Sequence, residues 1–172
     1  INNLLEIIDE VFGIAPTEPL DMNRFSTYQL ANDMVGRDSS WRDGGREGEL
    51  TSRASNNPRG LLVLENIDKA HQDALAYVDS MVTNGRLLDA LLDKQVSFAE
   101  NIVLMTCSID YRKSSNFVRM SEKLTGSIPK DKMADLVCDS ILNTPGGVTS
   151  ERNVCSIMRG ILSKTDAIIP MN

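Results

Sequence analysis

Short apolar segments alternate with amphipathic segments along the chain, and this pattern predicts an α/β fold. Two buried strands are expected at 61–66 and 101–108, where a run of four apolar residues is followed by polar ones. Apolar residues at helical spacing predict helices at 1–12, 24–36, 50–57, 68–83, 130–143 and 150–163, and a last strand is predicted at 167–171. Strands that alternate with helices in this way indicate a parallel sheet with helices on both faces.

One segment at 36–48 breaks the pattern, because it is polar and rich in glycine and charge. It predicts an exposed loop of about a dozen residues, and loops longer than the usual connection often have a function. Trp41, the only tryptophan, lies in this loop and not on an apolar stripe. Tryptophan usually buries much of its area, so Trp41 either folds back on the core or is offered to a partner.

Composition and charge then exclude several classes of protein. The chain has 172 residues and 41% hydrophobic residues, enough for one domain with a real core and too many for a disordered segment. With 18 basic and 24 acidic residues the net charge is −6, so the broad positive field of a nucleic-acid-binding domain is missing. The longest apolar runs are far shorter than a membrane span, and we expect neither nucleic acid nor membrane as a partner.

The residues that bind metals or form disulfides are few. Cys107, Cys138 and Cys155 lie far apart and are odd in number, which argues against a disulfide framework or a zinc site. A reducing, intracellular compartment (cytoplasm, nucleus or organelle stroma or matrix) fits this usage. His71, the single histidine, cannot build a multi-histidine metal site, and we expect it on the surface or at a helix cap.

The polar residues that follow the two predicted strands are the first candidates for a site. In open α/β sheets, ligands bind at the carboxyl ends of the strands. Glu65 and Asn66 lie at one such end, and Cys107 and Ser108 lie at the other. The alternative is that these residues only begin loops.

Several segments resemble one family, the Clp-type AAA+ unfoldases, in the order in which that family has them. Residues 48–71, GELTSRASNNPRGLLVLENIDKAH, are similar to the segment that contains the family's Walker B motif. Residues 84–89 resemble its D-G-R-L-T-D turn, and 101–108 resemble its sensor 1 strand. Residues 21–22 resemble its D-M-S segment, and 161–169 resemble its arginine-finger segment. The similarity is best to the second ATPase domain of ClpB.

This resemblance implies a fold and a domain organisation. It implies a three-layer α/β/α AAA+ large subdomain, built on a parallel sheet of about five strands. Residues 1–172 are then expected to be a fragment of that subdomain that lacks the Walker A loop and the C-terminal helical lid. The sequence accordingly contains no G-x-x-x-x-G-K-[ST] motif.

The resemblance also assigns roles to four positions, and each departs from the family pattern. Glu65 stands where the family has the Walker B aspartate that holds Mg²⁺, and Asn66 stands where it has the glutamate that activates water. An amide cannot accept a proton at a useful pKa. Ser108 matches the sensor 1 asparagine, and Lys164 matches the arginine finger without its bidentate fork. A register shift that made Asp68 the true acid is the alternative.

The family's pore loop, G-Y-V-G, aligns with 40–43. Trp41 keeps the aromatic residue that grips substrate, whereas Arg42 and Asp43 replace valine and glycine. The resemblance therefore predicts a substrate or partner contact at Trp41, Arg42 and Asp43.

Together these matches favour a degenerate Clp-like AAA+ domain, a protein-interaction or oligomerisation module with little or no ATP hydrolysis. Two alternatives stay open: an active ATP-dependent chaperone or unfoldase subunit, and a regulatory domain that binds nucleotide without hydrolysing it. ATP and Mg²⁺ are expected only in the longer protein, if its P-loop is intact, and none is expected for this fragment. The implied partners are proteins or a polypeptide substrate, and a homo-oligomer (a hexamer) is implied for the longer protein.

Overall fold

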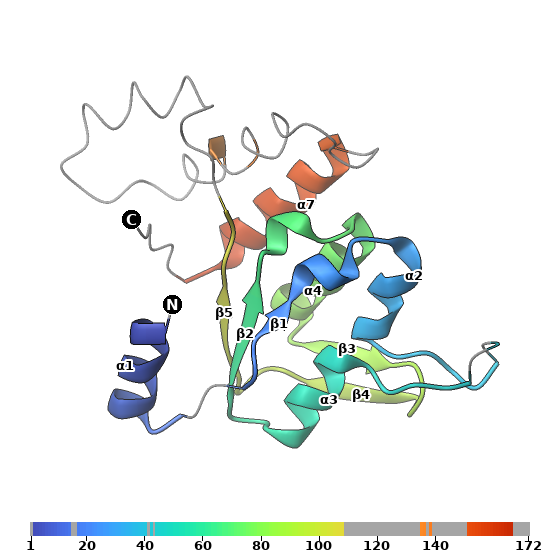
Figure 1. The fold of residues 1–172 in the computed structure, drawn as a ribbon, viewed down its shortest axis with the longest axis horizontal. Helices are drawn as coiled ribbons and strands as arrows, with labels where there is room; N and C mark the ends of the chain where they lie inside the picture. Colours follow the sequence, from blue (N-terminus) through green and yellow to red (C-terminus); the bar gives the residue numbers. More distant parts are fainter. Residues whose placement is uncertain are drawn as a thin grey trace. The chain divides into compact units, whose positions relative to one another are not determined.

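The fold is taken from a computed structural model that describes residues 2–14, 17–40, 42, 44–108, 135–136, 138 and 151–166 (Figure 1). The chain divides into two compact units, Ile1–Thr106 and Cys107–Asn172, which we describe one at a time. The strand predicted at 167–171 and most of the helix predicted at 130–143 lie outside the described residues.

The first unit contains a sheet of three parallel strands in the order β1–β2–β5, with bounds Leu20–Asp21, Leu61–Glu65 and Ile102–Met105. In the view of Figure 1, β2 lies between its two partners. The first four residues of β2 are at most 1% exposed, as expected for a strand that is covered on both faces. The predicted parallel α/β arrangement is therefore confirmed, with three parallel strands in the described part against about five expected.

Helix α1 (Asn2–Phe12) supplies part of the cover of this sheet. Leu5 packs in one buried cluster with Leu61 and Val63 of β2, which point to the same face of the strand. Ile8, Ile14 and Leu104 pack against this cluster. Leu62 and Leu64 point to the opposite face and are equally buried, so both faces of β2 are closed to water.

The helices that flank β2 agree with the predicted ranges. Helix α3 (Glu49–Asn56) precedes it, and α4 (Gln72–Asn84) follows after the short 3-10 helix η3 (Ile67–Lys69). Gly85 ends α4 in the left-handed conformation (φ 65°), where glycine has no steric penalty.

The prediction of a single helix at 24–36 is wrong, because three short helices form in this part of the chain. These are η1 (Met22–Phe25), α2 (Tyr28–Ala31) and η2 (Asn32–Met34). Asp21 and Thr27 have extended backbones, and their side chains accept hydrogen bonds from the first turns of η1 and α2. Two N-caps six residues apart start two separate helices, and a single continuous helix is thereby excluded.

A β-hairpin that the sequence analysis did not predict follows α4. Strands β3 (Arg86–Asp89) and β4 (Lys94–Ser97) pair antiparallel, and residues 90–93 connect them. Leu87 and Val96 lie opposite each other and are the buried apolar pair of the hairpin. One such pair gives too short an alternation to stand out in the sequence.

The second unit is described in its helix α7 (Glu151–Lys164), which confirms the helix predicted at 150–163. One side of α7 is buried, through Val154, Cys155, Met158, Ile161 and Leu162. The thiol of Cys138 lies 3.4 Å from the carbonyl oxygen of Cys155, and Arg159 pairs with Asp135 at 2.9 Å. Helix α7 therefore packs against the helical turn around 135–138. No helix within the described ranges is long and apolar enough to cross a lipid bilayer.

Candidate functional site

The candidate site lies at the edge of the sheet where the parallel strands end. Asp21, the last residue of β1, is the cross-strand partner of Glu65, the last residue of β2. Thr106 follows β5 directly, and its N–H donates to the carbonyl oxygen of Leu64 at 2.9 Å. The ends of the three strands thus bring Asp21, Glu65, Asn66 and Thr106 together.

Asn66 is held in one orientation at this edge. Its backbone is left-handed (φ 58°, ψ 44°), a conformation that asparagine tolerates better than most residues. Its N–H donates to the hydroxyl oxygen of Thr106 at 3.2 Å, and its side-chain Nδ2 donates to Oδ1 of Asp21 at 3.1 Å. The same Asp21 oxygen accepts from the N–H of Asn23 at 3.1 Å. The amide of Asn66 is therefore a hydrogen-bond donor to a carboxylate and offers no site for a proton.

Glu65 differs from Asn66, because its carboxylate is available. The residue is half-buried, and no hydrogen bond or ion pair engages its side chain within the described part of the chain. Mg²⁺ is usually held through one or two carboxylates together with substrate phosphates and waters, so Glu65 fits one ligand position of such an ion. The described residues contain no cluster of three or more histidine, cysteine or acidic residues that could hold a metal by themselves.

Glu65 is the last residue of β2. Asp68, the alternative acid, lies beyond it in η3, and its side chain is only 3% exposed. It pairs with the ammonium of Lys69 at 2.7 Å. His71 is the N-cap of α4, where its Nδ1 accepts from the N–H of Asp73 at 3.3 Å, which confirms the expected cap role.

Thr106 is a site residue that the sequence analysis missed. Its hydroxyl accepts from Asn66, and its carbonyl oxygen accepts from the N–H of Ile67 at 2.9 Å, so it fixes the turn after β2 from the neighbouring strand. The sequence analysis had instead selected Ser108, two residues further on. Ser108 is exposed and belongs to the second unit, as does Lys164, the exposed last residue of α7.

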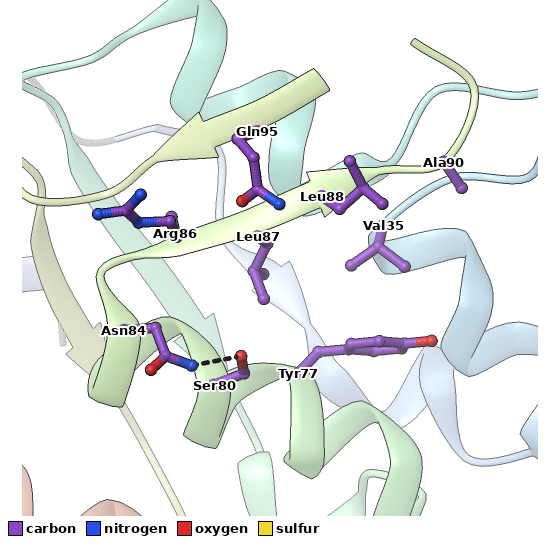
Figure 2. Close-up of a pocket in the computed structure, with 9 residues that line it drawn as sticks. All are labelled: Val35, Tyr77, Ser80, Asn84, Arg86, Leu87, Leu88, Ala90 and Gln95. Carbon is purple, nitrogen blue, oxygen red and sulfur yellow. Dashed lines mark hydrogen bonds between the residues drawn. The ribbon is translucent and has the colours of Figure 1, made fainter. Parts of the chain in front are cut away.

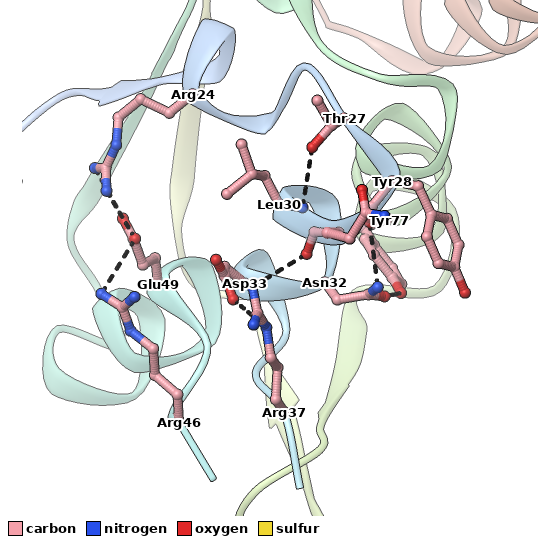
Figure 3. A network of polar contacts seen from close by, with 11 residues as sticks. Arg24, Thr27, Tyr28, Leu30, Asn32, Asp33, Arg37, Arg46, Glu49 and Tyr77 are labelled. Carbon is pink, nitrogen blue, oxygen red and sulfur yellow. Dashed lines mark hydrogen bonds and ion pairs between the residues drawn. The ribbon is translucent and has the colours of Figure 1, made fainter. Parts of the chain in front are cut away.

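The predicted loop at 36–48 has a fixed base. Arg37 and Arg46 exchange two backbone hydrogen bonds of 2.8 and 2.9 Å across the loop. Figure 3 shows the ion pairs around them: Asp33 with Arg37 at 2.6 Å, and Glu49 with Arg46 at 3.7 Å. Arg24 makes two parallel hydrogen bonds to Glu49, of 3.0 and 2.9 Å.

Three residues of this loop are predicted to contact a substrate or partner. Arg42 is exposed, and Trp41 and Asp43 lie outside the described residues, so their predicted contact stays a prediction.

Asp89, a second residue that the sequence analysis missed, joins this loop to the hairpin. It is 1% exposed and accepts hydrogen bonds from the N–H groups of Gly48, Leu91 and Leu92, each at 3.1 Å, and from the hydroxyl of Thr51. Burial raises the pKa of Asp89, but these hydrogen bonds outweigh burial and leave the pKa below its usual value. Asp89 therefore holds the end of the loop as a carboxylate.

Comparison with known proteins identifies the class. A family model described as "AAA domain (Cdc48 subfamily)" matches residues 6–145, and the chain belongs to this family. Within it, the chain is a Clp-type AAA+ domain, as its relatives indicate.

The ATP-dependent Clp protease ATP-binding subunit ClpE of Lactococcus lactis subsp. lactis (strain IL1403) is 25% identical over 176 residues, which cover 97% of this chain and 23% of ClpE. The chaperone protein ClpB of Staphylococcus aureus (strain N315) is 25% identical over 117 residues, 68% of this chain and 13% of ClpB. The chain thus spans less than a quarter of either relative.

A solved structure has the same fold. Hsp104, in a closed-state cryo-EM reconstruction with ATPγS and FITC casein, superimposes with a TM-score of 0.61 over 92% of this chain and 25% of the Hsp104 chain. The sequence identity is 16%, so this similarity supports the fold alone.

Proposed function

We propose that this chain is a degenerate Clp-like AAA+ domain that acts as a protein-interaction or oligomerisation module and hydrolyses ATP little or not at all. One observation supports this most directly. At the position of the water-activating glutamate stands Asn66, whose amide donates a hydrogen bond to Asp21. Loss of a general base commonly lowers the rate by about 10² to 10⁴.

The other predicted positions add to this proposal. Lys164 in place of the arginine finger gives a point charge where bidentate contact with phosphate oxygens is needed. Ser108 in place of the sensor asparagine is a shorter hydrogen-bonding group. The chain has no phosphate-binding P-loop sequence among its 172 residues.

Nucleotide binding without hydrolysis is the second candidate function. The observation that favours it is the available carboxylate of Glu65 at the end of the central strand, where the family holds Mg²⁺. Glu65 would supply one oxygen ligand, and Asn66 would leave the attacking water without a base.

The partners that we propose are polypeptides. The names of the relatives describe a chaperone and a protease subunit, and the Hsp104 reconstruction contains casein. The loop at 36–48, with its braced base and its exposed Arg42, is the surface that we assign to such a contact. We also propose that the longer protein forms a homo-oligomer, a hexamer. Its proposed location is intracellular, where a reducing environment keeps Cys107, Cys138 and Cys155 as thiols.

Phosphate release by the longer protein tests the proposal. We expect its ATPase rate to equal that of a variant in which its P-loop lysine is replaced. A turnover of about one per second or more, the range of working phosphoryl-transfer enzymes, that is abolished by the same replacement would refute the loss of hydrolysis. Titration with a fluorescent ATP analogue separates the two candidates, since the second candidate requires saturable binding without turnover.

A further inference from the structure

A groove of about 730 Å³ lies beside the hairpin, between helix α4, strand β3 and Val35 (Figure 2). Its volume falls in the range of ligand sites, roughly 300–1,000 Å³. All residues that line it belong to the first unit, and none is part of the Glu65–Asn66 edge.

The groove runs along one edge of β3. Leu87 and Leu88 both line it, although consecutive residues of a strand point to opposite faces. Leu87 is 6% exposed and Leu88 is 46% exposed, so one faces the core and the other faces water. A cavity that touches both faces of one strand must pass along the strand's edge.

The backbone of this edge has free hydrogen-bonding groups. In the hairpin register, Phe98 lies opposite Gly85 and donates to its carbonyl oxygen at 2.8 Å. Antiparallel pairs alternate between bonded and non-bonded, so Leu87 bonds to β4 and Leu88 points its N–H and C=O away from β4. Ala90, the next residue of the same parity as Leu88, donates to the carbonyl oxygen of Val35 at 2.8 Å, as this alternation requires.

Within the described residues, no hydrogen bond engages the N–H or C=O of Leu88. Such an edge is a template for one further strand. The bond from Ala90 to Val35 closes one end of the template, so the open part lies at Arg86 and Leu88.

The side chains around this edge indicate what would bind. Tyr77 donates its hydroxyl hydrogen to Asn32 at 3.0 Å, and Asn84 donates to Ser80 at 3.1 Å. Gln95 is a further polar residue of the lining. Arg86 is the only charged residue of the lining, is exposed, and makes no hydrogen bond or ion pair in the part of the chain that the structure describes. The groove therefore combines apolar side chains and uncharged polar ones with one cation that has no anionic partner among the described residues.

We propose that this groove binds an extended segment of a partner polypeptide, which adds to β3 as a third strand of the hairpin. The segment pairs through the N–H and C=O of Leu88, places an apolar side chain against the groove, and presents a carboxylate to Arg86. The proposal goes beyond the function proposed above and does not depend on whether the Glu65–Asn66 edge hydrolyses ATP.

Fluorescence anisotropy of the whole chain with a short labelled peptide tests this proposal. The probe alternates valine with glutamate and threonine. Leu88→Pro removes the outward N–H without touching the bonds to β4, and proline is tolerated at such edge positions. The variant loses one backbone hydrogen bond, since the carbonyl oxygen of residue 88 remains. One such bond is worth roughly two- to tenfold in affinity, so we expect binding to weaken by about that factor. Ser97→Pro is the matched control, because Ser97 lies opposite Arg86 in a non-bonded pair and points its N–H to the other edge of the hairpin.

Two further comparisons isolate the backbone and the charge. A probe with N-methylated backbone amides cannot donate backbone hydrogen bonds, and we expect it not to bind the unchanged chain. This comparison tests the strand pairing even if the Leu88→Pro variant does not fold. A second probe has lysine in place of glutamate. The unchanged chain should bind the glutamate probe more tightly, and the Arg86→Glu variant should bind the lysine probe more tightly.

Three results would each overturn the proposal. The first is equal binding of the methylated and unmethylated probes, and the second is unchanged binding to a folded Leu88→Pro chain. The third is a concentration-dependent dimer, seen by sedimentation, that Leu88→Pro abolishes, since the occupant of the edge would then be a second copy of this chain.

Discussion

The side-chain amide of Asn66 donates a hydrogen bond of 3.1 Å to the carboxylate of Asp21, across the ends of two parallel strands. In the register proposed above, Asn66 stands at the Walker B glutamate position, and this contact links it to the neighbouring strand. A glutamate at 66 would bring a second negative charge toward Asp21, whereas asparagine supplies a donor that Asp21 accepts. The amide of Asn66 is thus a hydrogen-bond donor to Asp21 and is not a base.

Asn66→Asp should destabilise the chain at neutral pH. It replaces a donor by a like charge beside Asp21, and losing a hydrogen bond to a charged group costs about 1.5–3 kcal/mol. Because the two carboxylates repel, the folded state of the variant binds a proton more readily than the unfolded state. The loss in free energy of unfolding, relative to the unchanged chain, should therefore shrink as the pH falls from about 7 toward about 4.

Urea denaturation at several pH values measures this deficit. Asp21→Asn combined with Asn66→Asp is the control, because it exchanges the two groups and restores a donor opposite a carboxylate. A pH-independent deficit in Asn66→Asp that the double variant does not reduce would show that the left-handed backbone, and not the Asp21 contact, requires asparagine.

Glu65→Gln should leave stability almost unchanged, within about 0.5 kcal/mol, because no hydrogen bond or ion pair engages this carboxylate in the described part of the chain. In the longer protein, we expect Mg²⁺ to tighten binding of a fluorescent ATP analogue and Glu65→Gln to remove that tightening. Titrations with and without Mg²⁺ measure both. If Mg²⁺ strengthens binding equally in the variant, Glu65 is not a ligand of the ion.

The central strand and its last residue could be predicted because four apolar residues in a row, ended by a polar pair, are typical of a buried parallel strand. The contact from Asn66 to Asp21 could not, since it depends on which strands are neighbours and in what register. Thr106 was missed for the same reason. It is the first polar residue after β5, which ends at Met105, and it contacts the turn that follows β2 only because the two strands are neighbours.

Other parts were missed because the local signal was weak or misread. The short helices between 22 and 34 follow from two N-caps, which an apolar periodicity does not reveal. The hairpin has one buried apolar pair, and its connection contains Asp93 in a left-handed conformation (φ 47°), not the glycine that marks many tight turns. Asp89 has the chemistry of an exposed residue and is buried because of partners far away in sequence.

Asp89→Asn should lower stability by about 1–3 kcal/mol at neutral pH, because four hydrogen bonds converge on the buried carboxylate. The hydrogen bonds hold the pKa of Asp89 below its usual value in the folded chain. Its contribution is therefore full above the unfolded pKa of about 3.9 and is lost as the pH falls through the lower, folded pKa.

The difference in stability between Asp89→Asn and the unchanged chain, measured from denaturation curves, should thus stay constant above about pH 4 and shrink as the pH falls further. Asp93→Asn, in the connection that follows β3, is the matched control, since Asp93 is exposed and asparagine tolerates its positive φ. Curves of Asp89→Asn that stay parallel to those of the unchanged chain at every pH would contradict the assignment of a buried, ionised Asp89.

Cys138 should react slowly with iodoacetamide in the folded chain. Burial, the neighbouring Cys155 and Asp135 raise the pKa of its thiol to about 12, although Arg159 opposes them, so almost no thiolate exists at neutral pH. Cys107 is half-buried and should be alkylated before Cys138 and Cys155, which are 1% and 7% exposed. Mass spectrometry of peptides after timed quenching gives the order, and all three should react together in denaturant. Labelling of Cys138 as fast as that of Cys107 would show that the turn around 135–138 opens readily.

Trp41→Ala should leave the melting temperature nearly unchanged and weaken binding of an unfolded polypeptide such as fluorescein-labelled casein. The base of the loop is held by the paired backbones of Arg37 and Arg46 and by Glu49 with its two arginines, none of which needs the tryptophan. An aromatic side chain at a contact with extended polypeptide is typically worth more than about 1 kcal/mol, so about a tenfold loss of affinity is expected. Arg42→Ala is the companion variant, because Arg42 is exposed and should contribute to the same contact. Should Trp41→Ala instead lower the melting temperature sharply, the tryptophan would be a core residue and the polypeptide contact would have to be sought elsewhere on the loop.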